Sequence, residues 1–193
     1  DVLIPRPETE DMVTAVLEAM PDRTAPVRIA DVGTGSGALA ITLALELPQS
    51  QVVAFELSPA AIAVAGTNAQ ALGAADRVAV VESDLMSAAE NREPFDIVVS
   101  NPPYIPLVEA PSLHAEVRDY EPHLALFAGE DGHAIYRRLI PEAAAHLRPG
   151  GLLLLETGGR VDLIQQMLRA DFDQVATRLD LQGIARIVEA RRH

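Results

Sequence analysis

Short apolar segments alternate with longer amphipathic or Ala/Leu-rich segments along most of the chain. Apolar runs bounded by turn residues are typical of buried strands, and we predict strands over residues 27–32, 51–56, 78–81, 95–100 and 152–156. The segments between them are bounded by N-cap residues, Pro or Gly, and predict helices over residues 9–20, 38–47, 59–72, 131–147 and 162–170. Strands that alternate with helices indicate βαβ units, so the pattern predicts an α/β fold with a mostly parallel sheet.

Two regions depart from this alternation. Residues 176–180 and 184–190 alternate apolar and polar side chains, which predicts an antiparallel pair of strands near the end of the chain. Residues 104–123 show no clear period and contain several prolines, so we predict a long loop directly after the fourth strand. Long loops in compact domains are often functional.

The composition is that of a single globular domain. Dividing 193 residues by about 150 gives one domain, and 49% apolar residues suffice for a core. The 28 acidic and 15 basic residues give a net charge of −13, which argues against a protein that binds nucleic acid by neutralising phosphates. The absence of Cys excludes disulfides and thiolate sites, and the five scattered His residues form no metal-binding pair.

The ends of the sequence bear on location and domain organisation. No apolar run reaches about 18 residues and no signal peptide opens the chain, so we expect a cytoplasmic protein that does not span a membrane. The chain starts on Asp1 and enters an apolar segment at once. We therefore expect it to be a fragment of a longer protein.

A glycine-rich turn follows the first predicted strand. Its spacing, Gly33-Thr34-Gly35-Ser36-Gly37, is GxGxG, which matches neither the GxGxxG of dinucleotide sites nor a P-loop. Ligands of open α/β sheets bind outside the carboxyl ends of the strands, and the segment from Asp31 to Gly37 lies at such an end. Taken alone, these glycines fit a tight structural turn equally well.

Acidic residues follow the next two predicted strands. Glu56 ends the second strand, and a carboxylate there can accept both hydroxyls of a ribose. Asp84 follows the third strand and can accept from an adenine amino group. Solvated surface acids are the alternative interpretation. Together with the glycine turn, the two acids favour a nucleoside ligand without a phosphate.

The tetrapeptide Asn101-Pro102-Pro103-Tyr104 follows the fourth predicted strand. The two prolines fix two φ angles and remove two N–H donors, so carbonyl oxygens point outward. The Asn101 side-chain oxygen and the Pro102 carbonyl can accept both N–H bonds of an amide or aniline-like nitrogen. They would aim its lone pair at an electrophile and stabilise the positive charge that grows on nitrogen. A rigid strand-ending turn is the structural alternative.

These segments together resemble one enzyme family over nearly the whole chain. They are PRPETE at residues 5–10, DVGTGSG at 31–37, SDL at 83–85, FDIVVSNPPYI at 95–105, YEP at 120–122 and PGG at 149–151. The chain resembles class I S-adenosylmethionine-dependent methyltransferases of the amino-methylating kind. More narrowly, it resembles the bacterial release-factor glutamine N5-methyltransferases. NPPY is shared with DNA and RNA amino-methyltransferases, whereas PRPETE is more specific.

The resemblance implies a fold, a cofactor and a partner. The fold is Rossmann-like, with a mostly parallel seven-stranded sheet, helices on both faces and an antiparallel C-terminal strand. S-adenosylmethionine is the cofactor, S-adenosylhomocysteine is the product, and no metal is involved. The substrate is the glutamine of the Gly-Gly-Gln loop in peptide-chain release factors. We expect a monomer that binds neither a membrane nor, directly, nucleic acid.

The resemblance also implies residue roles. The turn from Gly33 to Gly37 would contact the methionine moiety, Glu56 would hold the ribose, and Asp84 with Leu85 would bracket the adenine. The expected cofactor residues are Asp31, Gly33, Thr34, Gly35, Ser36, Gly37, Glu56, Leu57, Asp84, Leu85 and Asn101. The expected catalytic residues are Asn101, Pro102 and Tyr104. Substrate binding would use these three with Pro103, and the site would be closed from the N-terminal side by Arg6, Thr9 and Glu10.

The sequence departs from the family pattern in three respects. The family carries a helical N-terminal domain that helps to grip the release factor, and this chain lacks it. We expect residues 1–20 to form a linker segment and a helix, and residues 21–193 to form the methyltransferase domain. The family usually has Asp at the position of Glu56. It also tends to carry a Gln shortly after Glu156-x-Gly158, where this chain has Gly159-Arg160-Val161.

Three other functions fit part of the sequence. A DNA or RNA adenine N6-methyltransferase would use the same acceptors, but the charge of −13 and the 4% aromatic residues argue against it. A non-catalytic S-adenosylmethionine-binding module would have no use for an amide-orienting tetrapeptide. A nicotinamide dehydrogenase is disfavoured by the glycine spacing and by the lack of a proton-transfer group near the turn.

Overall fold

The computed structural model describes residues 2, 7–90, 93–114, 121–180 and 182–193. Its strands are β1 (Val27–Val32), β2 (Ser50–Glu56), β3 (Val78–Glu82), β4 (Phe95–Ser100), β5 (Leu147–Glu156), β6 (Phe172–Leu179) and β7 (Ala185–Arg192). Its α-helices are α1 (Pro7–Ala19), α2 (Ala38–Glu46), α3 (Pro59–Ala71), α5 (His123–Leu126), α6 (Ala134–His146) and α7 (Val161–Leu168). Two short 3-10 helices are η1 (Ser87–Ala89) and η2 (Leu107–Ser112).

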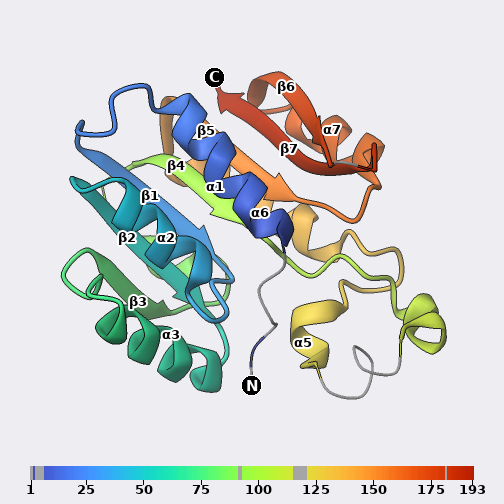
Figure 1. The fold of residues 1–193 in the computed structure, drawn as a ribbon. Coiled ribbons are helices and arrows are strands. Elements are labelled where there is room, and N and C mark those ends of the chain that lie inside the picture. Colours follow the sequence, from blue (N-terminus) through green and yellow to red (C-terminus); the bar gives the residue numbers. More distant parts are fainter. Residues whose placement is uncertain (1, 3–6, 91–92, 115–120, 181) are drawn as a thin grey trace.

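The strands form one seven-stranded sheet in the order β3-β2-β1-β4-β5-β7-β6 (Figure 1). Strands β1 to β5 are parallel, and β7 runs antiparallel to both of its neighbours. This arrangement confirms the predicted fold class, including the antiparallel C-terminal strand. The order reverses between β1 and β4, and ligands of such sheets bind at the carboxyl ends of the strands flanking this point.

Helices cover both faces of the sheet, which explains why its strands are continuously apolar. Neighbouring residues on β1 and on β5 enter different cores: Ile29 and Leu154 join one, and Ala30 and Leu153 join the other. The first core is closed by α1 and α2, which cross in front of the sheet in Figure 1. The second is closed by α6 and α7. The sheet is therefore the central layer of three.

The strand and helix boundaries differ from the predicted ones mainly around β5. That strand begins at Leu147, not at residue 152. The register shifts between Phe95 and Ile97, so residues 148–151 bulge out of the β4 pairing. Gly151 fits there because a Cβ would lie 2.8 Å from the Arg148 carbonyl oxygen. From the sequence, Pro149-Gly150-Gly151 predicts the end of a helix before the strand. In the structure, these residues form a bulge within β5.

Three smaller differences follow from tertiary packing. Strand β6 begins at Phe172, four residues before the predicted start, because this side chain is buried in the second core. Helix α6 starts at Ala134, and Pro141 lies inside it. The predicted loop over 104–123 contains η2 and the start of α5. Among the described residues, no helix is both long and apolar enough to cross a membrane.

Candidate functional site

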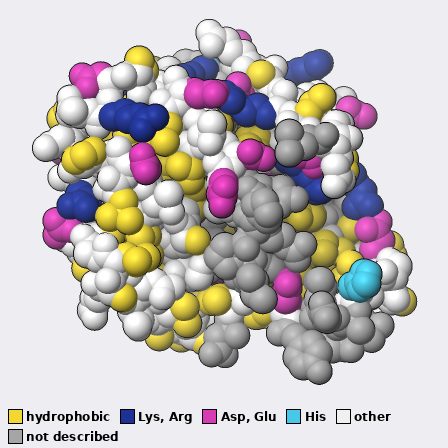
Figure 2. Space-filling view, in the orientation of Figure 1, with side chains coloured by type: hydrophobic (Ala, Val, Ile, Leu, Met, Phe, Trp, Pro, Cys, Tyr) yellow, Lys and Arg dark blue, Asp and Glu magenta, His cyan; other side chains and the backbone are white. Residues whose placement is uncertain are grey.

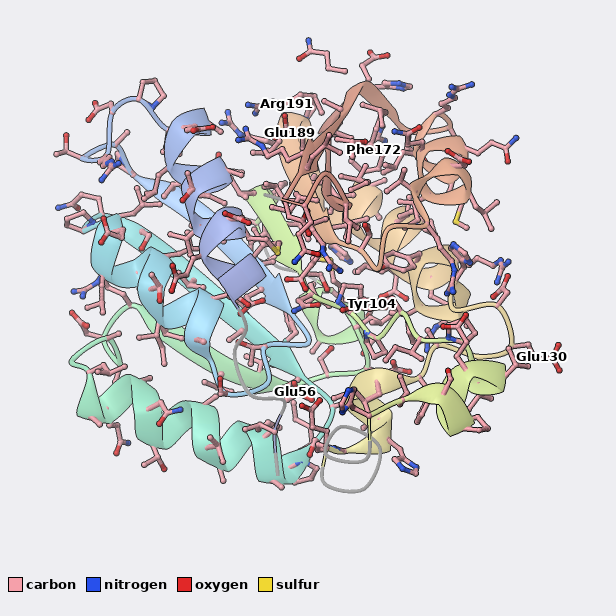
Figure 3. The ribbon with its side chains drawn as sticks, turned by 45° about the vertical axis from the view of Figure 1, so that its right-hand side comes forward. Glu56, Tyr104, Glu130, Phe172, Glu189 and Arg191 are labelled. Atoms are coloured by element: carbon pink, nitrogen blue, oxygen red, sulfur yellow. The ribbon has the colours of Figure 1, made fainter. Side chains whose placement is uncertain are left out.

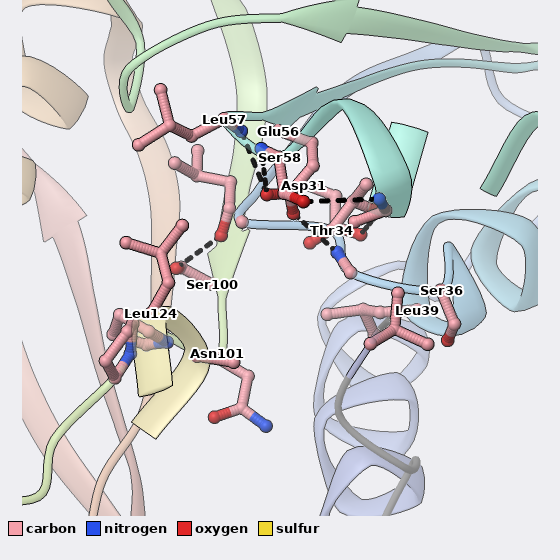
Figure 4. Close-up of a pocket in the computed structure, with 18 of the residues that line it drawn as sticks. Asp31, Thr34, Ser36, Leu39, Glu56, Leu57, Ser58, Ser100, Asn101 and Leu124 are labelled. Carbon is pink, nitrogen blue, oxygen red and sulfur yellow. Dashed lines mark hydrogen bonds between the residues drawn. The ribbon is translucent and has the colours of Figure 1, made fainter. Parts of the chain in front are cut away.

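A cavity opens at the carboxyl ends of β1 to β4, where the first four strand-to-helix connections meet (Figure 4). Thirteen of the residues predicted for the site line it: Thr9, Asp31, Gly33, Thr34, Gly35, Ser36, Glu56, Leu57, Asp84, Leu85, Asn101, Pro102 and Pro103. The structure thus brings together segments that lie far apart in the sequence. Gly37, Tyr104 and Glu10 are not among the lining residues.

The glycine turn presents its backbone to this cavity. Gly33 and Gly35 have φ angles of 73° and 57°, in the left-handed region where a side chain is strained. A Cβ at either position would meet no atom within 4 Å, so these glycines are needed for conformation and not for packing. Gly37, with a φ of 82°, is needed for both reasons, because a Cβ there would also lie 3.0 Å from Ile41 Cδ1 and 3.2 Å from Ala65 Cβ.

Glu56 connects the ends of β1 and β2. Its Oε2 accepts from the backbone N–H of Gly35 at 2.8 Å, and its Oε1 accepts from the N–H groups of Leu57 and Ser58 at 2.9 Å each. A carboxylate has room for about four hydrogen bonds. These three bonds fix the carboxylate in place and leave acceptor capacity mainly on Oε2.

Asp31 lies at the floor of the cavity and is almost fully buried. Its Oδ2 accepts from the Thr34 hydroxyl at 2.6 Å and from the Ala40 N–H, in the first turn of α2, at 3.2 Å. Burial raises the pKa of this carboxyl to about 6, although the Thr34 hydrogen bond opposes the shift. An Asp with such a pKa favours a cation beside it, because a positive charge would compensate the lost hydration.

The connection after β3 forms another wall, with Ser83, Asp84 and Leu85 lining the cavity. Ser83 is buried, and its N–H donates to the Glu56 carbonyl at 2.8 Å. The Asp84 carboxylate accepts from the Arg138 guanidinium at 2.8 Å, a contact the sequence did not predict. Leu85 has a φ of 52°, which is unusual for a residue with a side chain.

Asn101, Pro102 and Pro103 follow β4 directly and line the cavity. The Ser100 hydroxyl donates to the Val32 carbonyl at 2.6 Å and so joins the ends of β4 and β1. Figure 4 shows the Asn101 amide projecting into the cavity, without a hydrogen bond to any of the residues drawn. Among the residues drawn, both polar atoms of this amide are unpaired.

Tyr104 points elsewhere. It lines a second, small cavity with Gly132, His133, Tyr136 and Gly158, and Figure 3 places it on the side of the C-terminal elements relative to Glu56. A Cβ on Gly158 would lie 2.7 Å from Tyr104 Cδ2, so the ring packs directly on this glycine. These contacts show that Gly158 supports the Tyr104 ring, and the packing of this ring beside the target stays a prediction.

The N-terminal residues predicted to close the site are only partly described. Thr9, in the first turn of α1, lines the cavity, as does Val2. Glu10 is exposed on the same helix and is not among the lining residues. Arg6 lies outside the described residues.

Several lining residues were not predicted, notably Leu39 on α2, Leu124 on α5 and Ile135 on α6. Their sequence context is that of ordinary helix residues, and only the path of the chain brings them to the cavity. Leu124 is 60% exposed, so it forms part of the rim. In the described part of the chain, no group of three His, Cys, Asp or Glu residues is arranged to hold a metal ion.

Comparison with known proteins gives a consistent set of relatives. A family model described as "Methyltransferase small domain" matches residues 9–112. A release factor glutamine methyltransferase of Koribacter versatilis is 45% identical over 99% of this chain and 67% of its own length. One of Bradyrhizobium diazoefficiens is 46% identical over 98% of this chain and 65% of its own. The chain thus spans about two thirds of these curated relatives.

Solved structures agree on the fold. A 16S rRNA N2 G1207 methyltransferase of Thermus thermophilus, in complex with AdoMet and guanosine, superposes with a TM-score of 0.71. The match covers 98% of this chain and 44% of that one, at 21% identity. At this identity the likeness extends to the architecture alone.

Proposed function

The chain belongs to the release factor glutamine methyltransferase family, and we propose that it transfers the methyl group of S-adenosylmethionine to a glutamine side-chain amide nitrogen in release factors. The proposed target is the glutamine of their Gly-Gly-Gln motif. The observation that carries the proposal is the juxtaposition, in one cavity, of the Asn101 amide with the Glu56 and Asp31 carboxylates. Family membership supplies the substrate, and the cavity supplies groups suited to it.

The residues present fit the cofactor. Glu56 keeps acceptor capacity on Oε2 for a ribose hydroxyl, and the buried Asp31 favours the positive charge of an ammonium or sulfonium group. The glycine turn, with no side chains at Gly33 and Gly35, allows close approach of a ligand to the backbone. We assign no metal to the reaction. When bound, S-adenosylmethionine supplies the electrophilic methyl group.

The task of this chain's own residues is to hold and orient the amide. An amide nitrogen is a poor nucleophile because its lone pair is delocalised into the carbonyl. The Asn101 oxygen and the Pro102 carbonyl can accept its two N–H bonds, which directs the lone pair and stabilises developing positive charge. A strong general base is not required, since the nitrogen becomes acidic once it is alkylated and its proton can leave to solvent.

An adenine N6-methyltransferase remains the alternative, because an exocyclic amine would use the same acceptors. The charge of −13 disfavours it. On the face shown in Figure 2, the described basic side chains lie in separate groups among acidic ones and form no continuous strip. As a modifier of translation factors, the protein would act in the cytoplasm.

Label transfer tests the proposal. Methyl-labelled S-adenosylmethionine is incubated with the protein and either purified release factor or duplex DNA, and the Gly-Gly-Gln peptide is analysed by mass spectrometry. Label on that glutamine alone supports the proposal, and label on DNA would replace it with the adenine reaction. Asn101→Ala serves as the inactive control in both tubes.

A further inference from the structure

The connection after β3 is held in an unfavourable backbone conformation at the cavity wall. Leu85 lines the cavity and has a φ of 52°, a region in which its Cβ crowds the backbone. Strained residues of this kind persist when the surrounding structure fixes them, and they cluster at functional sites. The contacts that hold Leu85 in place therefore shape this wall of the cavity.

Both neighbours of Leu85 are held by helix α6. The Met86 N–H donates to Glu142 Oε2 at 3.0 Å, and Asp84 Oδ2 accepts from the Arg138 guanidinium at 2.8 Å. Arg138 and Glu142 are four residues apart and so lie on one face of the helix. Ile135, which lines the cavity, lies on the same face, three residues before Arg138 and seven before Glu142.

The two contacts differ in strength. The side chains of Arg138 and Asp84 are each 50% exposed, and ion pairs in water contribute little. The bond from Met86 to Glu142 is partly buried and has an ionised acceptor, which makes it the stronger of the two. It also acts on the residue that directly follows Leu85. Glu142 is therefore the stronger of the two supports that α6 gives to the turn. Within the turn, the Ala88 N–H donates to the Ser83 hydroxyl oxygen at 3.1 Å and the Ser87 N–H to the Asp84 carbonyl at 3.2 Å.

We propose that Glu142, assisted by Arg138, is a positioning residue that holds the Asp84–Leu85 wall in the shape required to bind the adenosine part of the cofactor. Glu142 is not among the residues that line the cavity, so it acts through Met86. The proposal rests on the proposed function, because it assumes that an adenosine-containing cofactor occupies this cavity. Helix α6, which packs against the sheet, would thereby also contribute to cofactor affinity.

Three variants separate positioning from general stability. Glu142→Ala removes the acceptor, and Glu142→Gln keeps an acceptor oxygen without the charge. Glu18→Ala is the matched control: Glu18 also lies in the second half of a 13-residue helix and makes one charged contact, to Arg178 at 2.6 Å. Glu18 is not among the residues that line the cavity.

Two ligands report binding in calorimetry: S-adenosylhomocysteine and 5′-methylthioadenosine, which carries the adenosine without the amino acid. We expect Glu142→Ala to weaken both by about tenfold, as the loss of a hydrogen bond to a charged group implies. The Kd values of Glu142→Gln should lie within about threefold of those of the parent. The Kd values of Glu18→Ala should equal those of the parent. Amide hydrogen exchange over residues 83–89 should accelerate only in Glu142→Ala.

The outcomes are distinct. If the parent binds both ligands and Glu142→Ala binds them equally well, the positioning role is wrong while the proposed function stands. The same holds if Glu142→Ala weakens both ligands but hydrogen exchange over residues 83–89 is unchanged, because Glu142 would then not act through the turn that its bond to Met86 holds. If the parent binds neither ligand, the proposed function itself fails.

Discussion

Replacing Gly158 by Ala tests whether the support beneath Tyr104 controls catalysis. Gly158 has no unusual positive φ, so Ala fits its backbone and the change is purely steric. The new Cβ would lie 2.7 Å from Tyr104 Cδ2 and 3.0 Å from Cε2, whereas ordinary contact begins at 3.4 Å. The ring must therefore retreat by about 0.7 Å, a displacement typical of overpacked sites that cost about 1–3 kcal/mol.

The ring is attached to a closely packed segment of backbone. A Cβ on Gly132 would lie 2.5 Å from the Tyr104 carbonyl oxygen, which shows how closely this backbone is enclosed. Tyr104 directly follows Pro103 at the cavity wall, so we expect part of the displacement to reach the proposed amide acceptors. Misplacement by about 1 Å can cost about a hundredfold in rate, and we expect kcat to fall by about 10- to 100-fold.

The assay measures kcat with saturating release factor and, separately, the Kd of S-adenosylhomocysteine. The Kd should stay within about twofold, because neither Gly158 nor Tyr104 is among the residues lining the cofactor cavity. Gly66→Ala, in α3, is the control, since a Cβ there meets no atom within 4 Å and should stabilise the helix by about 0.5–1 kcal/mol. Unchanged kcat in Gly158→Ala would refute the reasoning, and so would a matching loss of cofactor affinity.

Three further predictions concern the cavity itself. Asn101→Ala should abolish methyl transfer and leave the S-adenosylhomocysteine Kd within several-fold, and residual transfer near the parent rate would remove Asn101 from its assigned role. Glu56→Ala should weaken cofactor binding by roughly 1–3 kcal/mol in calorimetry, since a ribose acceptor and the anchor of three N–H groups are lost together. Cofactor affinity should rise with pH through about 6, because the pKa of Asp31 is raised to about 6 from 3.8 and only the ionised form attracts a cation. This pH dependence of cofactor affinity should vanish in Asp31→Asn. If the variant keeps the profile of the parent, the titrating group is not Asp31.

The sequence predicts the cavity well, because chain order alone constrains it. Each of the four connections that line it follows a buried strand, and parallel strands place their carboxyl ends at one edge. The glycine turn, Glu56 and Asn101 could therefore be located without coordinates. Their meeting in one cavity depends on backbone topology, which the alternating pattern encodes.

The side-chain contacts that the sequence does not predict depend on how the helices and strands pack against one another. Asp84 lines the cavity, and its carboxylate also pairs with Arg138, 54 residues later, a contact that the sequence does not predict. The Tyr104 ring packs on Gly158, which lies two residues beyond the end of β5. Contacts between side chains so far apart in sequence follow from the packing of α6 and β5, and no local periodicity carries that information.

The position of β7 has a consequence for how this chain folds during synthesis. The strand lies between β5 and β6, so β6 is made before β7 but joins the sheet only through it. Until residues 185–192 have left the ribosome, β5 exposes an apolar edge with unpaired backbone groups, which invites association with other chains. We expect nascent chains halted before this strand to depend on chaperones, and the domain to close in a single late step.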